Sequence, residues 1–182
     1  MDIQEKFVKM DRNNIEAYTP KYAVDIILPF INKEITIWAP FSKDEHNFAG
    51  YLKELGYKVI NTHFDPETGE GNDFLTYKPD FYFDIIIDNP PFKGKTKFVK
   101  KALSYNKPFM LFLPVNSLGD NGIPNAFIKY NRDIQLLIPD KRTEFENQEK
   151  KGISFKTAYL CQGILPRQII FTKLIKQPPN RE

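Results

Sequence analysis

The stretch Phe83-Asp84-Ile85-Ile86-Ile87-Asp88-Asn89-Pro90-Pro91-Phe92 holds a short apolar run that ends at two consecutive prolines. Three isoleucines in a row, bounded by acids, predict a strand that is buried on both faces, as in a parallel sheet. Proline cannot donate a hydrogen bond to a sheet ladder, so the strand must end before Pro90. The sequence therefore places Asn89 and Phe92 on a stiff turn at the carboxyl end of a central strand, where open α/β sheets bind their ligands.

The flanking sequence predicts alternating strands and helices. Apolar spacing predicts a helix within 15–31, with Thr19 as its cap and Pro20 in its first turn. Ser42-Lys43-Asp44-Glu45 has the form of a capping box and predicts a helix from residue 42 to 55. The other predicted elements are strands at 34–38, 57–60, 83–87, 108–115, 134–138, 157–162 and 168–174, and helices at 93–105 and 125–130. The segment 140–151 is expected to be too polar to pack. This order predicts an α/β domain with a mostly parallel sheet and an antiparallel edge strand.

Composition sets the broad class. A chain of 182 residues predicts a single domain, 1–176, followed by a frayed tail, 177–182. The formal net charge of +3 and the pI near 8.8 permit a polyanionic partner without requiring one. The single cysteine, Cys161, excludes an internal disulfide and fits a reducing cytoplasm. No signal peptide or membrane span is expected from the apolar runs.

Asn89-Pro90-Pro91-Phe92 resembles the catalytic (D/N)PP(Y/F) motif of S-adenosylmethionine-dependent amino-methyltransferases, above all the DNA adenine-N6 family. The resemblance implies a class I methyltransferase-like Rossmann fold with S-adenosylmethionine as cofactor. It also implies catalytic roles for this motif. The Asn89 side-chain oxygen and the Pro90 carbonyl would accept the protons of the target amine, the Pro90-Pro91 pair would hold that carbonyl rigid, and Phe92 would stack on the extruded base. Asp88 is expected to have a supporting part only.

The resemblance implies a cofactor site built from earlier segments. Thr19 and Pro20 are similar to a Thr-Pro element that lies over the methionine part of the cofactor. The next family motif is Asp-Pro-Phe with a glycine turn, and Trp38-Ala39-Pro40-Phe41-Ser42 stands in its place, with Ala39 for the acid and no glycines. Trp38, Pro40 and Phe41 are the expected cofactor residues here. The run from Trp38 to Phe48 also resembles a small phage-associated branch.

That departure puts the usual grip on the cofactor's amino acid moiety in doubt. The free N–H groups of a helix that opens at Ser42 offer one alternative hold on the cofactor carboxylate, and Asp44 or Glu45 would then pair with its ammonium. An ordinary capped helix is an equal alternative.

Two acids farther along complete the implied cofactor site. Asp65, near the end of a strand, is the candidate acceptor for the ribose hydroxyls, with turn formation as the alternative. His63 is expected to be structural. Asp73-Phe74 is similar to the motif that holds the adenine, with Asp73 accepting from its amine and Phe74 packing on its face.

The implied partner is nucleic acid, most of all DNA. Lys93, Lys95 and Lys97 follow the motif, and Lys141 and Arg142 lie in the polar segment; such residues contact phosphates without reading sequence. A solvated surface is the alternative for the second group. Specificity is expected from short loops, a partner subunit or a homo-oligomer, and no metal is expected, because the two histidines and one cysteine form no ligand cluster. The alternatives are methylation of RNA adenine or of a protein glutamine, or a methyltransferase-like fold that binds without catalysis.

Overall fold

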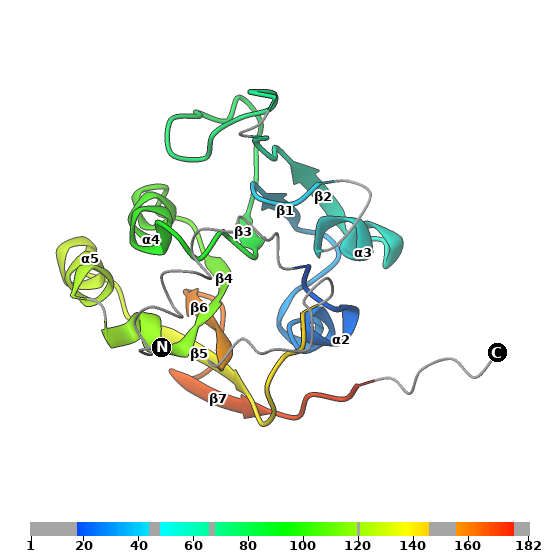
Figure 1. The fold of residues 1–182 in the computed structure, drawn as a ribbon, viewed down its shortest axis with the longest axis vertical. Helices are drawn as coiled ribbons and strands as arrows, with labels where there is room; N and C mark the ends of the chain where they lie inside the picture. The colour runs from blue at the N-terminus through cyan, green and yellow to red at the C-terminus, as the bar shows by residue number, and fades with distance from the viewer. Residues whose placement is uncertain (1–17, 44–47, 66–67, 120, 146–155, 177–182) are drawn as a thin grey trace, which may run out of the picture.

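The computed structural model describes residues 18–43, 48–65, 68–119, 121–145 and 156–176, and seven strands of this part form one sheet (Figure 1). The order across the sheet is β2-β1-β3-β4-β6-β5-β7. The strands are β1 (Thr36–Ala39), β2 (Lys58–Asn61), β3 (Ile85–Asp88), β4 (Phe109–Pro114), β5 (Gln135–Pro139), β6 (Thr157–Gln162) and β7 (Ile169–Thr172). Each lies within three residues of the strand predicted from its apolar run.

The sheet is mostly parallel, as predicted. Strands β2, β1, β3 and β4 pair in parallel, and so do β5 and β7. The antiparallel strand is β6, which lies between β4 and β5 rather than at an edge. Its residues Thr157–Cys161 are all buried, which a strand inside the sheet requires. The edge strand β7 is parallel to its neighbour β5. The predicted antiparallel strand is therefore present, but it lies inside the sheet and not at its edge.

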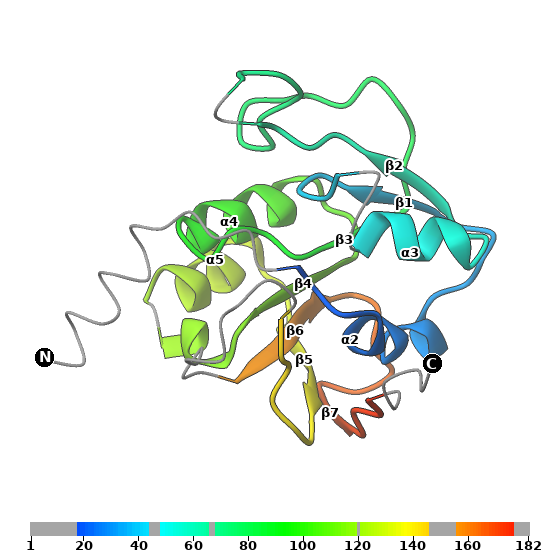
Figure 2. The ribbon, with the colours of Figure 1, turned by 45° about the vertical axis from the view of Figure 1, so that its right-hand side comes forward.

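Helices cover both faces of the sheet, giving three layers (Figures 1 and 2). On one face lie α2 (Lys21–Asp25) and α3 (Phe48–Glu54), and on the other α4 (Lys95–Ser104) and α5 (Gly122–Tyr130). The 3-10 turns are η1 (Leu28–Phe30) and η2 (Val115–Gly119). Strand β3 packs against the helices on both faces of the sheet. Ile85 and Ile87 belong to the core under α2 and α3, while Ile86 packs with α4. This double burial is why its sequence is apolar without alternation.

Helix starts differ from the sequence predictions. Helix α2 begins at Lys21 with Pro20 at its N-cap and no side-chain cap bond, so Thr19 is not the cap. The prediction of a capping box at Ser42 is also wrong. Lys43 lies outside any helix, and the Ser42 hydroxyl donates to the Asp88 carboxylate instead. A tertiary hydrogen bond has thus replaced the local one that the pattern predicted.

The polar segment after β5 does pack in part. Thr143 and Phe145 are buried, and the Phe145 ring contacts those of Phe92 and Phe112. The expectation that 140–151 is too polar to pack is therefore wrong for its first half, and residues 146–151 lie outside the described part, as does the predicted tail 177–182. Among the described residues no helix has the length and apolar character needed to cross a membrane.

Candidate functional site

The candidate site lies where the carboxyl ends of β1 and β3 meet. From β1 the chain continues to β2 on one side, while β3 lies on the other side of β1. The place between these two strand ends is a topological switch point, where open parallel sheets bind ligands. The segments after β1, β2 and β3 supply most of the residues that the sequence singled out.

The corner after β3 begins as predicted, because the strand ends at Asp88 and the two prolines follow. Pro90 is buried, Pro91 is exposed, and Asn89 and Phe92 are half-buried. The Phe92 ring packs edge-on against Phe145, with ring centroids 5.9 Å apart. Pro91 therefore lies at the surface, the Asn89 side-chain oxygen is buried, and the Phe92 ring is braced by the segment that follows β5.

Asp88 is the residue that sequence reasoning underrated. Its side chain is fully buried and accepts hydrogen bonds from Phe41, Ser42 and Asn89. The Phe41 backbone N–H donates to Oδ2 at 2.6 Å, and the Ser42 hydroxyl and the Asn89 backbone N–H (2.8 Å) donate to Oδ1. One carboxylate thus joins the segment after β1 to the corner after β3. The sequence alone provides no signal for this role, because Asp84 flanks the same three isoleucines and is only half-buried.

The environment of Asp88 shifts its protonation. Burial raises the pKa of the Asp88 carboxyl to about 6, against the opposing effect of its hydrogen-bond donors. No cation pairs with this carboxylate among the described residues. At neutral pH, within the described part of the chain, hydrogen bonds therefore hold a buried negative charge at the switch point.

Of the cofactor residues expected from β1 and the segment after it, Trp38 is the most deeply buried. Its side chain is fully buried, its Nε1 donates to Thr62 Oγ1 at 2.9 Å, and other aromatic rings enclose it. Trp38 is a core residue, and its side chain presents no surface to a ligand. Pro40 is buried as well, whereas Phe41 is half-buried and lies against the rings of Phe74 and Phe98.

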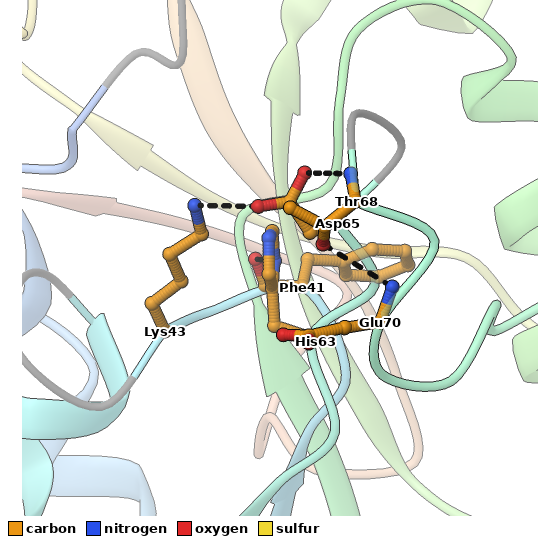
Figure 3. A network of polar contacts seen from close by, with 6 residues as sticks. All are labelled: Phe41, Lys43, His63, Asp65, Thr68 and Glu70. Atoms are coloured by element: carbon orange, nitrogen blue, oxygen red, sulfur yellow. Dashed lines mark hydrogen bonds and ion pairs between the residues drawn. The ribbon is translucent and has the colours of Figure 1, made fainter.

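The segment after β2 folds back on the segment after β1 (Figure 3). His63 Nδ1 lies 2.8 Å from the Phe41 carbonyl oxygen, which supports the structural role expected for this histidine. Asp65 forms an ion pair with Lys43 at 3.6 Å, and its side chain is 30% exposed. Asp65 Oδ1 also accepts a hydrogen bond from the Thr68 backbone N–H at 3.4 Å, so this acid takes part in a turn. Its carboxylate nevertheless remains partly accessible, next to Phe41.

Asp73 and Phe74 come to the same end of β1. Asp73 Oδ1 accepts the Leu75 N–H at 2.9 Å, and its carbonyl accepts the Tyr77 N–H at 2.8 Å, so Asp73 organises a turn. Phe74 is 2% exposed, and its ring centroid lies 5.0 Å from that of Phe41. The predicted partner for an adenine face is thus enclosed by other rings in this structure.

The remaining predicted residues lie around this centre. Thr19 and Pro20 are buried at the start of α2. The Tyr22 hydroxyl of that helix donates to the Glu144 carbonyl at 3.0 Å, which ties α2 to the segment after β5. Lys93, Lys97, Lys141 and Arg142 are exposed, and Lys95 is half-buried. Asp44 and Glu45, the candidates for the cofactor ammonium, lie outside the described residues, and no metal-binding group of three or more ligands occurs within the described part.

Comparison with known proteins identifies the fold of the chain. No protein-family model and no curated protein sequence matches the chain. A protein from Listeria monocytogenes assigned to the class I S-adenosylmethionine-dependent methyltransferases matches with a TM-score of 0.60 at 13% identity, over 94% of this chain and 71% of that one. A Pyrococcus horikoshii protein assigned as an RNA methyltransferase gives 0.57 at 16% identity, over 82% and 86%. A predicted O-methyltransferase from Agrobacterium tumefaciens gives 0.51 at 11% identity, over 84% and 83%. The chain therefore has the class I methyltransferase fold.

Proposed function

We propose that this protein is an S-adenosylmethionine-dependent methyltransferase that modifies the exocyclic N6 amine of adenine in nucleic acid, with DNA as the first candidate. The observation that carries the proposal is the corner from Asp88 to Phe92 at the switch point of a class I methyltransferase fold. The corner combines a half-buried Asn, a buried Pro and a half-buried ring, and it matches the motif of the amino-methyltransferases in sequence.

In this reaction the protein mainly has to position the reacting groups. The lone pair of the adenine amine is delocalised into the ring, and acceptors for its two protons favour the tetrahedral nitrogen that forms as the methyl arrives. The Asn89 side-chain oxygen and the Pro90 carbonyl are the acceptors, and one such preorganised contact contributes a few kcal/mol. Phe92 stacks on the extruded base. When bound, S-adenosylmethionine supplies an electrophilic methyl group on its sulfonium.

The residues present fit the cofactor in part. Asp65 offers a partly exposed carboxylate after β2 for the ribose hydroxyls, and Asp73, half-buried near Phe41, is the candidate for the adenine amine. Ala39 offers no charge for the amino acid end, and the Ser42 hydroxyl is already bound to Asp88. The cofactor's hold therefore differs from the usual Asp-Pro-Phe and glycine arrangement.

The charge near the corner supports a polyanionic substrate. Residues 89–132 contain eight Lys and Arg side chains and a single acid, Asp120. Several of them, including Lys97 and Lys100, are exposed on or next to α4, which follows the corner directly. Phosphate contacts from such a surface would supply affinity without sequence preference.

The decisive variant is Asn89→Ala, with Asn125→Ala on the exposed face of α5 as the matched control. Labelled S-adenosylmethionine is incubated with DNA, RNA and protein substrates, and the products are analysed as nucleosides and amino acids. We expect N6-methyladenine from the wild-type protein, a loss of about a hundredfold or more in turnover for Asn89→Ala, and cofactor affinity within about twofold of wild type. Equal loss of affinity and turnover would count against the role assigned to Asn89. Methylglutamine as the product would show that the substrate is a protein and not a nucleic acid.

A second candidate, a nucleic-acid-binding protein without catalysis, is favoured by one observation. Ala39 and the missing glycines remove the usual hold on the cofactor's amino acid end. Calorimetry with S-adenosylmethionine separates the two functions, because a binding protein of this kind has no measurable affinity for it while retaining affinity for nucleic acid.

A further inference from the structure

The segment after β1 is held in place by a side chain from the neighbouring strand. Asp88 Oδ2 accepts the Phe41 N–H, and Oδ1 accepts both the Ser42 hydroxyl and the Asn89 N–H. The three donors come from the two sides of the switch point. Any displacement of the segment after β1 relative to the catalytic corner must break at least one of these bonds.

The same strand carries a second carboxylate that provides an internal comparison. Asp84, just before β3, accepts the Thr36 N–H at 2.8 Å and the Tyr82 hydroxyl at 2.5 Å. Asp84 thus ties the amino end of β1 to β3 in the way that Asp88 ties the carboxyl end. Asp84 is half-buried and lies at the end of the strands away from the candidate site, whereas Asp88 is fully buried within it.

We propose that Asp88 is a positioning residue that fixes the segment Pro40–Lys43 for cofactor binding, in place of the glycine turn that this segment lacks. The inference rests on the proposed function and assigns Asp88 no contact with the reacting atoms. A glycine turn holds its shape through the backbone angles that glycine allows. Here the shape comes from two hydrogen bonds to a carboxylate beneath the segment, one from Phe41 N–H and one from the Ser42 hydroxyl.

The burial of Asp88 argues for such a use. Burial of a carboxylate disfavours its charged form, the pKa of Asp88 is raised accordingly, and no described residue gives it a cationic partner. An apolar residue would fill this place with less penalty if packing were the only requirement. What an apolar residue cannot do is accept hydrogen bonds from N–H and O–H groups on both sides of the switch point.

Asp88→Asn tests the inference, because it keeps the shape and changes one atom. With the amide oxygen at the position of Oδ1, the bonds from Ser42 and Asn89 are kept, while the amide NH2 faces the Phe41 N–H. The variant thus removes the Phe41 bond in particular. Asp84→Asn is the matched control, because it makes the same change at the other end of the same strand pair.

Three measurements are made on the full chain: amide hydrogen exchange of Phe41, affinity for S-adenosylmethionine by calorimetry, and the melting temperature. We expect Asp88→Asn to speed exchange at Phe41 and to weaken the cofactor about tenfold or more, with a melting temperature no lower than wild type. Asp84→Asn should leave the Phe41 exchange and the affinity at wild-type values. Ser42→Ala, which removes one donor and leaves Asp88 intact, should weaken the cofactor a few-fold and provides the test if Asp88→Asn does not fold.

The outcomes separate this inference from the proposed function. Wild-type cofactor affinity in Asp88→Asn and Ser42→Ala, in a protein that binds S-adenosylmethionine, overturns the positioning role alone. Faster exchange throughout the molecule with a lower melting temperature shows a structural role and also overturns it. Absence of cofactor binding by the wild-type protein overturns the proposed function and this inference together.

Discussion

Asp84 and Asp88 show how far two identical side chains on one strand can differ. Burial raises the pKa of Asp88 to about 6. The hydrogen bond from the Tyr82 hydroxyl, followed by that from the Thr36 backbone N–H, lowers the pKa of Asp84 below its usual value. The sequence places both acids at the ends of the isoleucine run, and only the fold decides which one is removed from water.

These shifts give opposite pH dependences of stability. Because the folded-state pKa of Asp88 lies above its usual value of 3.8, the folded protein binds the proton more tightly, and the stability that this provides is lost as pH rises through about 6. Urea unfolding at pH 5 and pH 8 should show Asp88→Asn gaining about 1 kcal/mol relative to wild type at the higher pH. Asp84→Asn should show the reverse trend at lower pH, since stability from a depressed pKa is lost as pH falls. A difference between Asp88→Asn and wild type that does not change with pH would contradict the raised pKa.

Among the elements, the loop between β2 and β3 depends on one close approach. A Cβ at Gly71 would lie 1.8 Å from the His63 carbonyl oxygen, and the backbone φ of Gly71 is +86°. His63 in turn contacts the Phe41 carbonyl through its Nδ1, so Gly71 supports the turn that brings Asp65 toward the segment after β1 (Figure 3). This loop is therefore linked to the candidate cofactor site through the His63 side chain.

Gly71→Ala should destabilise the protein by about 1–3 kcal/mol, because the new methyl group meets backbone rather than a mobile side chain. Gly69→Ala is the control: its φ is +75°, and nothing lies within 4 Å of a Cβ there. Both variants carry the strain of a positive φ, so the difference between them isolates the contact with His63. Urea unfolding measures the stability and calorimetry the cofactor affinity, and equal effects of the two variants would show that the loop moves freely to accept the methyl group.

The elements also show which parts of the fold the sequence could predict. The strands followed from apolar runs, which in β3 and β4 reflect burial on both faces, and the parallel order followed from the alternation with helices. The predicted helix starts were wrong where the side chain expected to cap the helix forms another hydrogen bond. The Ser42 hydroxyl, for example, donates to Asp88. The core packing of Trp38 and the contact of Phe145 with Phe92 were not predicted for a similar reason, since local sequence does not reveal which partners a ring will meet. The corner from Asp88 to Phe92 was predictable as a place in the fold, and its support by Asp88 was not, because that contact joins residues 46 and 47 positions apart.

At the scale of the whole molecule, charge is divided between the two sides of β3 in the sequence. The loop 62–84, which projects from the body in Figures 1 and 2, contains six acids and one lysine, Lys78. The segment 89–132 is strongly basic, although the complete chain has a formal net charge of only +3. A polyanion that reaches the corner is therefore attracted by α4 and repelled by the loop, which favours approach over α4.

This division predicts which lysines contribute to nucleic-acid affinity. Lys97→Ala with Lys100→Ala removes two exposed charges from α4, whereas Lys78→Ala with Lys173→Ala removes two exposed charges elsewhere and leaves the net charge equal to that of the first pair. Binding to a duplex and to a single strand is measured by fluorescence anisotropy across a salt series. If the α4 lysines contact phosphates, their removal lowers the slope of log affinity against log salt by about 1 for each lysine, and the second pair leaves the slope unchanged. Equal losses for the two pairs would mean that only the total charge matters. In that case the charge division would not orient the substrate over α4, and the corner would receive its base from another direction.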